Sequence, residues 1–258
     1  MFRRTGFFKS PRQFDDINIG EENGIRSLFL GSPTIQSSMR LTRPFDLVLD
    51  YTKTMMAFML FLPKFNKVAC IGLGGGSIPK FLWKYFPHVD VTTVEINERV
   101  ISIAHNYFDV PESDNRFRVI HANASDWIQS DDQYDVIFLD AFDGLGVPSD
   151  LIEDRFIDDV AGSLTECGVY VQNLWASDPN FAERVEQVER HFSNTLLIPS
   201  EKRGNVSAIG FIKPQKKFYK TKLLELAAEL DKRYDLNFKK MVASFNDYDS
   251  LLSKKIDI

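Results

Sequence analysis

Residues 67–82 read KVACIGLGGGSIPKFL, an apolar run of strand length followed by a glycine cluster and a helix-like segment. This order predicts a strand, a tight loop and a helix. Gly72, Gly74, Gly75 and Gly76 let the chain turn sharply and let a ligand approach the main chain without a Cβ clash. The helix start beyond them offers unpaired N–H groups. The loop is therefore a candidate ligand site, and a tight turn that binds nothing is the simpler alternative.

From residue 66 onward, strand-like and helix-like segments alternate. The strand-like runs are 67–72, 91–95, 117–122, 134–140 and 169–174. The helix-like segments between and after them are 78–86, 98–108, 124–129, 151–164 and 180–192. This alternation predicts a parallel sheet with helices on both faces, and such sheets bind ligands at the carboxyl ends of their strands.

Two further strand-like runs, 195–199 and 206–212, are separated by only six residues. That connection is too short for a helical crossover, so the pair should be antiparallel. A parallel α/β sheet closed by an antiparallel hairpin resembles the class I methyltransferase fold, which is Rossmann-like.

The residues ahead of this sheet predict a small β region. Short β-like runs at 25–30 and 34–39 have the pattern of a hairpin. A helix is predicted over 44–62, because proline suits a first helical turn, and another over 219–233. The basic, aromatic start of the chain is interpreted as an N-terminal arm. The predicted division is a small β region over 1–43, a Rossmann-like domain over 44–235 and a C-terminal tail over 236–258.

The composition is that of an ordinary globular protein, with 44% hydrophobic and 26% charged residues among 258. The net charge of −5 argues against non-specific nucleic-acid binding, which needs a basic surface. No apolar run is long enough for a membrane span. Cys70 and Cys167 cannot form a disulfide framework, so we expect a reducing cytoplasm. The four histidines show no metal-ligand spacing, and no metal site is expected.

Glu95 closes the predicted strand 91–95 and follows Gly72 by 23 residues. A carboxylate at the end of the second strand accepts hydrogen bonds from two ribose hydroxyls, in NAD sites and S-adenosyl sites alike. The dinucleotide motif G-x-G-x-x-G needs glycine or alanine where Ser77 stands, which disfavours a nicotinamide site. That site is kept as an alternative to S-adenosyl binding.

Polar side chains also follow the third and fourth predicted strands. Asn123 follows the run 117–122 and can bond an adenine edge through its amide, or it can simply cap a helix. Asp140 and Asp143 lie at the end of the run 134–140. Two carboxylates there suit a cationic substrate, or a base that takes a proton from an attacking amine. For Asp143 an ordinary turn is the alternative.

Four stretches carry a resemblance to a known family: GLGGGSIPKFL, VTTVEINERVISIAHNYF, YDVIFLDAFDGLGVPSDL and CGVYVQNLW. They resemble the spermidine synthases, which are polyamine aminopropyltransferases built on the class I methyltransferase fold. The resemblance covers roughly residues 20–212. It implies transfer of an aminopropyl group from decarboxylated S-adenosylmethionine to a small-molecule diamine, and it implies a homodimer.

By position, the resemblance places five residues around the donor nucleoside. Glu95 would hold the ribose, and Asn123 would stand where the family has an adenine-binding aspartate. Gln36 resembles a glutamine that reaches the nucleoside from the N-terminal sheet. Ile96 and Ala124, next to the first two, complete the predicted nucleoside site.

On the acceptor side, Asp140 would be the acid that deprotonates the attacking amine, and Asp143 would help to hold the substrate. Tyr51 matches a tyrosine of the family's Tyr-His-Glu segment, of which only the tyrosine is present here. The family's glycine loop has an aspartate that contacts the donor's amine, and Gly75 stands in its place. That aspartate would repel the carboxylate of ordinary S-adenosylmethionine, so Gly75 removes one basis for selecting the decarboxylated donor.

The form GLGGGS also resembles a subset of spermidine-synthase-like methyltransferases. Two alternatives therefore stand beside aminopropyl transfer. One is methyl transfer from S-adenosylmethionine, and the other is a non-catalytic protein that keeps the nucleoside pocket.

Overall fold

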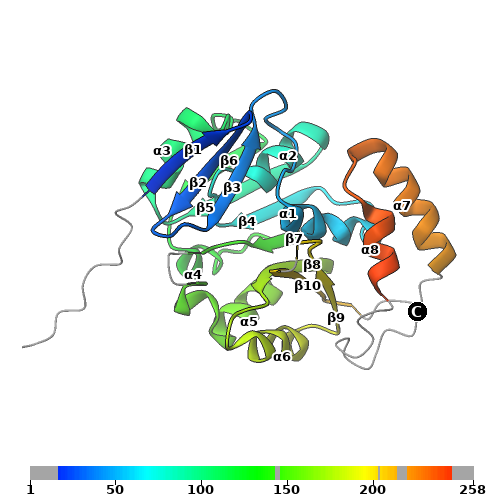
Figure 1. The fold of residues 1–258 in the computed structure, drawn as a ribbon. Helices are drawn as coiled ribbons and strands as arrows, with labels where there is room; N and C mark the ends of the chain where they lie inside the picture. The colour runs from blue at the N-terminus through cyan, green and yellow to red at the C-terminus, as the bar shows by residue number, and fades with distance from the viewer. Residues whose placement is uncertain (1–16, 143–145, 203, 214–219, 246–258) are drawn as a thin grey trace, which may run out of the picture.

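The computed structural model describes residues 17–142, 146–202, 204–213 and 220–245 (Figure 1). Its main body is a seven-stranded sheet with the strand order β6-β5-β4-β7-β8-β10-β9. The strands are β4 (Lys67–Ile71), β5 (Asp90–Glu95), β6 (Phe117–His121), β7 (Tyr134–Leu139), β8 (Leu164–Trp175), β9 (Asn194–Pro199) and β10 (Asn205–Phe211). Strands β4 to β8 are parallel neighbours, whereas β10 runs antiparallel to both β8 and β9. The predicted α/β sheet with its antiparallel hairpin is confirmed.

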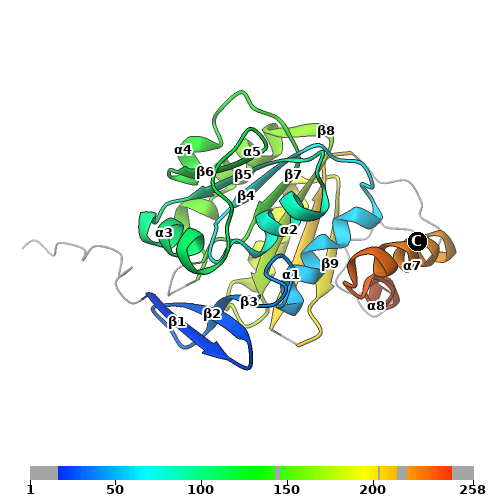
Figure 2. The same ribbon diagram turned by 90° about the horizontal axis from the view of Figure 1, so that it is seen from above.

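Helices cover both faces of this sheet (Figures 1 and 2). They are α1 (Asp50–Met55), η1 (Met56–Leu60), α2 (Ser77–Tyr85), α3 (Glu98–Tyr107), α4 (Ala124–Trp127), η2 (Ser149–Leu151), α5 (Asp154–Gly162), α6 (Phe181–His191), α7 (Lys220–Tyr234) and α8 (Phe238–Ser244). Helices α1 to α3, α7, α8 and the 3-10 helix η1 share one core with the sheet, and α4 to α6 share the other. Side chains alternate along β4, so Val68 and Cys70 enter the first core and Ala69 and Ile71 the second.

The N-terminal β region is an antiparallel sheet of three strands, β1 (Ile17–Glu22), β2 (Ile25–Leu30) and β3 (Ile35–Arg40). The sequence predicted β2 and β3 but not β1. A turn at Asn23 and Gly24 joins β1 to β2, with φ of 50° and 73°. Two central residues at positive φ are typical of the two-residue hairpin turn, for which Asn-Gly is the strongest signal. That dipeptide could have revealed the missing strand.

The predicted helix over 44–62 begins only at Asp50 and tightens into a 3-10 helix at Met56. Pro44 lies instead in a turn, where the N–H of Asp46 donates to a carbonyl three residues back. Proline suits such a turn as well as a first helical turn, so its position did not identify the start of the helix.

Two further boundaries differ from the sequence pattern. Strand β8 begins at Leu164 rather than at residue 169, because Leu164 pairs with Tyr134 ahead of an irregularity in the register. The stretch 236–258 shows no regular pattern in the sequence, yet α8 lies within it. Phe238 of α8 is fully buried in the same core as α7, so the packed structure extends beyond residue 235.

Gly210 of β10 lies beneath the ring of Phe192, which stacks on Tyr170 with ring centroids 5.2 Å apart. A Cβ at position 210 would lie 2.5 Å from the Phe192 ring. We predict that Gly210→Ala lowers the free energy of unfolding by ~1–3 kcal/mol, because overpacking displaces the stacked rings. Gly162→Ala is the matched control, since nothing lies within 4 Å of its Cβ position. Urea denaturation measures both variants, and equal stabilities would contradict the packing argument.

Candidate active site

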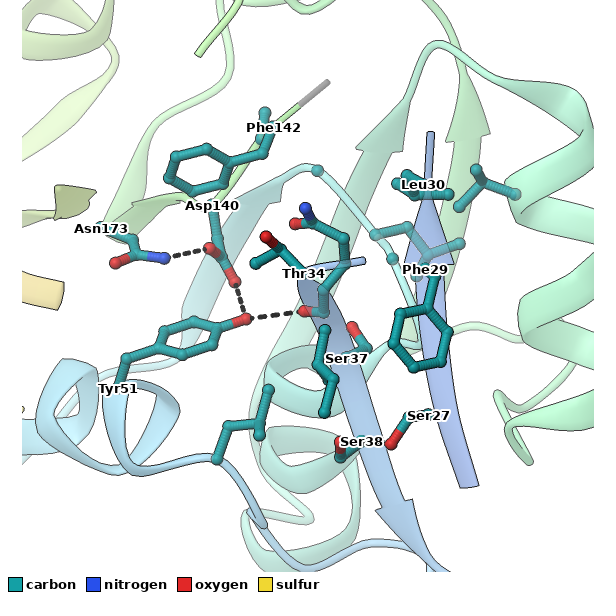
Figure 3. Close-up of a pocket in the computed structure, with 18 of the residues that line it drawn as sticks. Ser27, Phe29, Leu30, Thr34, Ser37, Ser38, Tyr51, Asp140, Phe142 and Asn173 are labelled. Carbon is teal, nitrogen blue, oxygen red and sulfur yellow. Dashed lines mark hydrogen bonds between the residues drawn. The ribbon is translucent and has the colours of Figure 1, made fainter. Parts of the chain in front are cut away.

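A cavity of about 760 Å³ lies between the N-terminal sheet and the carboxyl ends of the main strands (Figure 3). Loops that are far apart in the sequence meet there, because parallel strands end at the same edge of a sheet. The cavity brings together most of the predicted site residues, namely Gln36, Tyr51, Gly72, Gly74, Glu95, Ile96, Asn123, Ala124 and Asp140. Gly75 and Gly76 lie outside its lining, and Asp143 lies outside the described residues.

The loop between β4 and α2 adopts backbone conformations that favour glycine. Gly72, Gly74 and Gly76 have φ of 93°, 51° and 66°. A Cβ on Gly72 would lie 2.4 Å from the carbonyl oxygen of Asp140. The loop can therefore pass the end of β7 only without a side chain at position 72.

Glu95 is hydrogen-bonded to the glycine loop. Its Oε2 accepts the N–H of Leu73 at 3.0 Å, and its Oε1 accepts the N–H of Asn97 at 2.9 Å. Burial raises the pKa of Glu95, and the backbone hydrogen bonds oppose this rise. A carboxylate has about four lone-pair sites, so it can also accept from ribose hydroxyls. The neighbouring Ile96 is 40% exposed in the cavity wall, where it offers an apolar surface to a nucleobase.

Asp140 directly follows β7 and lies at the centre of a hydrogen-bond network (Figure 3). Its Oδ2 accepts from the Tyr51 hydroxyl at 3.2 Å, and its Oδ1 accepts from the Asn173 amide at 2.8 Å. Burial raises the pKa of Asp140 to about 6, and the two hydrogen bonds act in the opposite direction. At pH 7 such a carboxyl is mostly ionised and more basic than an ordinary aspartate, which suits a general base.

The network extends from Asp140 in two directions. The Tyr51 hydroxyl also lies 3.1 Å from the carbonyl oxygen of Gln36 in β3. On the other side, the Asn205 amide of β10 donates to Asn173 Oδ1 at 3.0 Å. Tyr51 has one hydroxyl proton, so it donates either to Asp140 or to the Gln36 carbonyl. The N-terminal sheet and the β9–β10 hairpin are therefore both connected to the candidate base.

Gln36 also presents its side chain to the cavity. Within the described part of the chain, its buried Nε2 has no hydrogen-bond partner. A buried donor without a partner costs about 1–3 kcal/mol, so an acceptor on a ligand would stabilise this position. The observation fits a nucleoside in the cavity.

Ser37 of β3 occupies the space beside Gly75. Its Oγ accepts the Gly75 N–H at 2.9 Å. A Cβ on Gly75 would lie 2.9 Å from Ser37 Cβ and 2.8 Å from the Phe108 ring. The backbone of Phe108 is held in turn by the buried Lys80, which donates to the Phe108 carbonyl oxygen. Burial lowers the pKa of Lys80 to about 7. An aspartate at position 75 would have to displace Ser37 or Phe108, so in this chain the N-terminal sheet docks where the resemblance expects a carboxylate.

Phe142 and Trp175 form a stacked pair in the cavity wall, with centroids 4.7 Å apart and planes 8° apart. The sequence singled out neither ring, nor Asn173 and Asn205. Trp175 and Asn173 lie at the end of β8, and Asn205 pairs with Trp175 across β8 and β10. The pairing of β7 with β8 brings Asn173 and Trp175 to the cavity, and the pairing of β8 with β10 brings Asn205. The polar Asn173 near the end of an apolar run was the available signal.

The cavity wall is acidic. Its acidic residues are Glu21, Glu22, Asp50, Glu95, Asp140 and Asp150. Among the lining residues that the structure describes, Lys202 is the one basic side chain. A concave surface lined by carboxylates favours cationic ligands.

In the described ranges, no group of three or more histidine, cysteine, aspartate and glutamate side chains is placed to hold a metal ion. None of the helices in these ranges is long and apolar enough to cross a membrane.

The sheet order and the glycine loop define a class I methyltransferase-like fold. The family model for the spermine/spermidine synthase domain matches residues 49–196. A polyamine aminopropyltransferase of Neisseria meningitidis serogroup A is 37% identical over 233 residues, which is 89% of each chain. One of Chromobacterium violaceum is 35% identical over 88% of each chain. The chain therefore belongs to the spermine/spermidine synthase family, and it is a transferase.

Solved structures agree on the fold. A probable spermidine synthase from Corynebacterium glutamicum gives a TM-score of 0.70 at 18% identity, over 89% of this chain and 91% of its own. Human methyltransferase-like protein 13, in complex with SAH, gives 0.66 at 25% identity, over 73% of this chain and 93% of its own. The fold is therefore shared by aminopropyltransferase and methyltransferase relatives.

We predict that Asp140→Asn raises the free energy of unfolding at pH 8, because it removes a buried charge. A folded pKa of about 6 against the usual 3.8 corresponds to about 3 kcal/mol, of which ~1 kcal/mol is lost with one hydrogen bond. Because the raised pKa penalises the ionised folded state, the wild type loses stability as pH rises through this window. The gain should therefore shrink by about two-thirds at pH 5. Urea unfolding at both pH values measures it, and a less stable variant at pH 8 would refute the burial argument.

Proposed function

We propose that the protein transfers an aminopropyl group from decarboxylated S-adenosylmethionine to the nitrogen of a small amine, with Asp140 as the general base. The observation that carries this proposal is the partly buried carboxylate of Asp140, held by Tyr51 and Asn173 in the same cavity as Glu95. A base of this kind is needed when the acceptor is an amine, because a protonated amine cannot attack.

The residues present fit an S-adenosyl donor. Glu95 offers carboxylate oxygens to the ribose, and Ile96 offers an apolar surface to the adenine ring. Gln36 offers a buried N–H donor that has no hydrogen-bond partner among the described residues. The donor's sulfonium makes the adjacent carbon electrophilic, so the chain need not form a covalent intermediate.

The chain's own groups then align the acceptor and remove its proton. Tyr51 and Asn173 hold the Asp140 carboxylate in place. Asp140 takes a proton from the attacking nitrogen as the new carbon–nitrogen bond forms and the carbon–sulfur bond of the donor breaks. The products are the extended amine and methylthioadenosine. Most of the rate gain expected from such a site comes from alignment and from this proton transfer.

The charge of the cavity supports the decarboxylated donor. Decarboxylated S-adenosylmethionine has a sulfonium and an ammonium group but no carboxylate, so it is the more cationic of the two donors. Six carboxylates line the cavity, and Lys202 is the one basic residue among the described lining residues. Desolvating the carboxylate of S-adenosylmethionine in this wall would be costly without a cationic partner.

Methyl transfer from S-adenosylmethionine is the second candidate. Gly75 leaves no carboxylate to repel that donor, and Ser37 and Phe108 fill the space instead. The likeness to human methyltransferase-like protein 13 in complex with SAH points the same way. A dimeric assembly and a cytoplasmic location stay predictions.

Calorimetric titration with decarboxylated S-adenosylmethionine, S-adenosylmethionine and methylthioadenosine tests the proposal, followed by mass spectrometry of a diamine acceptor. We predict tighter binding of the decarboxylated donor and an aminopropylated product. Glu95→Ala should weaken binding by ~1–3 kcal/mol, because it removes charged acceptors. Glu98→Ala is the matched control, since Glu98 is exposed outside the cavity. Preference for S-adenosylmethionine with a methylated product would establish the second candidate, and binding of none would reject both.

We predict that kcat/KM falls as pH drops through about 6, because protonated Asp140 cannot accept a proton. Asn173→Ala removes a hydrogen bond that lowers this pKa, so the acid limb should move to higher pH. Asn106→Ala is the control, since it truncates an exposed asparagine that bonds Ser102 and lies outside the cavity lining. Asp140→Asn should cut turnover by about 10²-fold or more. An acid limb that Asn173→Ala leaves in place would remove Asp140 from the role of base.

A further inference from the structure

Asn123 follows β6 at the point where the resemblance expects an adenine-binding aspartate. Its Oδ1 accepts the Ser125 N–H at 2.8 Å and so caps α4. The remaining polar group, Nδ2, is a donor and lies 3.4 Å from Asp150 Oδ2. Asn123 can therefore donate to a nucleobase through Nδ2, but its amide supplies no carboxylate at this position.

Asp150 of η2 supplies a carboxylate at this place. It lines the cavity together with Ala122, Asn123 and Ala124. Its Oδ2 lies 3.4 Å from both Asn123 Nδ2 and Ser125 Oγ, which orient the carboxylate against the first turn of α4. An acceptor and a donor thus stand side by side at the end of the cavity beyond Glu95.

This pair matches the edge of adenine. Adenine presents an amino donor next to a ring-nitrogen acceptor, whereas hypoxanthine presents a carbonyl acceptor next to a ring N–H donor. A carboxylate accepts only, and an amide NH₂ donates only. A fixed acceptor–donor pair therefore discriminates between the two bases, because the wrong base leaves polar groups unpaired.

We propose that Asp150 accepts a hydrogen bond from the exocyclic amino group of the donor's adenine and so takes the place of the aspartate that the family has at position 123. The inference rests on the proposed function, because it assumes an S-adenosyl ligand in this cavity. Asp150 is then the residue that determines base specificity, with Asn123 as the neighbouring donor. Both roles concern the nucleoside alone and leave the proposed role of Asp140 as general base unaltered.

Calorimetric titration with methylthioadenosine and methylthioinosine tests this role without any turnover. We predict that the wild type binds the adenine nucleoside at least about tenfold more tightly, the discrimination expected from a good pair of base-edge hydrogen bonds. Asp150→Asn should bring the affinity ratio close to one, because the new amide can donate to the hypoxanthine carbonyl. Asp126→Asn is the matched control, since it removes the same charge from an exposed position on α4 outside the cavity lining.

A double variant separates base recognition from a structural role. Asp150→Ala should lose the preference for adenine, and adding Asn123→Asp should restore it, because aspartate caps a helix as asparagine does and also offers a carboxylate. If the hydrogen bonds of Asp150 only hold η2 against α4, Asp150→Asn will lower the free energy of unfolding but leave the ratio of the two nucleoside affinities unchanged. That result would overturn the inference. Equal binding of both nucleosides by the wild type would overturn it as well, while leaving the donor assignment intact. Binding of neither nucleoside would overturn both this inference and the proposed function.

Discussion

The close approach of Gly72 to the backbone of Asp140 is the contact on which the candidate site depends. Strand β4 pairs with both β5 and β7, so its loop lies between the strand ends that carry Glu95 and Asp140. The N–H of Asp140 donates to Ile71 and the N–H of Gly72 donates to Val94, each at 2.9 Å. The distance between the proposed nucleoside carboxylate and the proposed base is thus set by the spacing of the sheet. A side chain at position 72 would force these strand ends apart.

The N-terminal sheet completes the site from the other side. A three-stranded sheet needs an apolar face to bury, and Leu28 and Met39 of this sheet pack against Phe108 of the main domain. Ser37 accepts from the glycine loop, Arg26 donates to the Tyr107 carbonyl at 2.7 Å, and the Tyr51 hydroxyl lies 3.1 Å from the Gln36 carbonyl oxygen. The sheet covers the cavity, and it is burial that raises the pKa of Asp140. The docking of this sheet and the basicity of Asp140 are therefore physically linked.

Much of this architecture could be predicted from local pattern. The alternation of apolar runs and helical stripes identified the sheet, its helices and its closing hairpin, because each signal lies within one short segment. The glycine loop, Glu95 and Asp140 were predicted in the same way, Tyr51 was predicted from the family resemblance, and all four contribute to one cavity. Strand β1 was missed although its Asn-Gly turn was available. The start of α1 was misplaced because Pro44 serves a turn as well as a helix.

The sequence alone determined the family, the fold and the side chains at the carboxyl ends of the first four parallel strands, because those residues directly follow recognisable apolar runs. Only the tertiary structure showed what surrounds them. Asn173 reaches Asp140 through the pairing of β7 with β8, and Asn205 reaches Asn173 through the pairing of β8 with β10. Ser37 reaches Gly75 from a separate sheet, and Asp150 reaches Asn123 across 27 residues. Such contacts join segments that are distant in the sequence, so no local pattern records them, and they arise only when the chain packs.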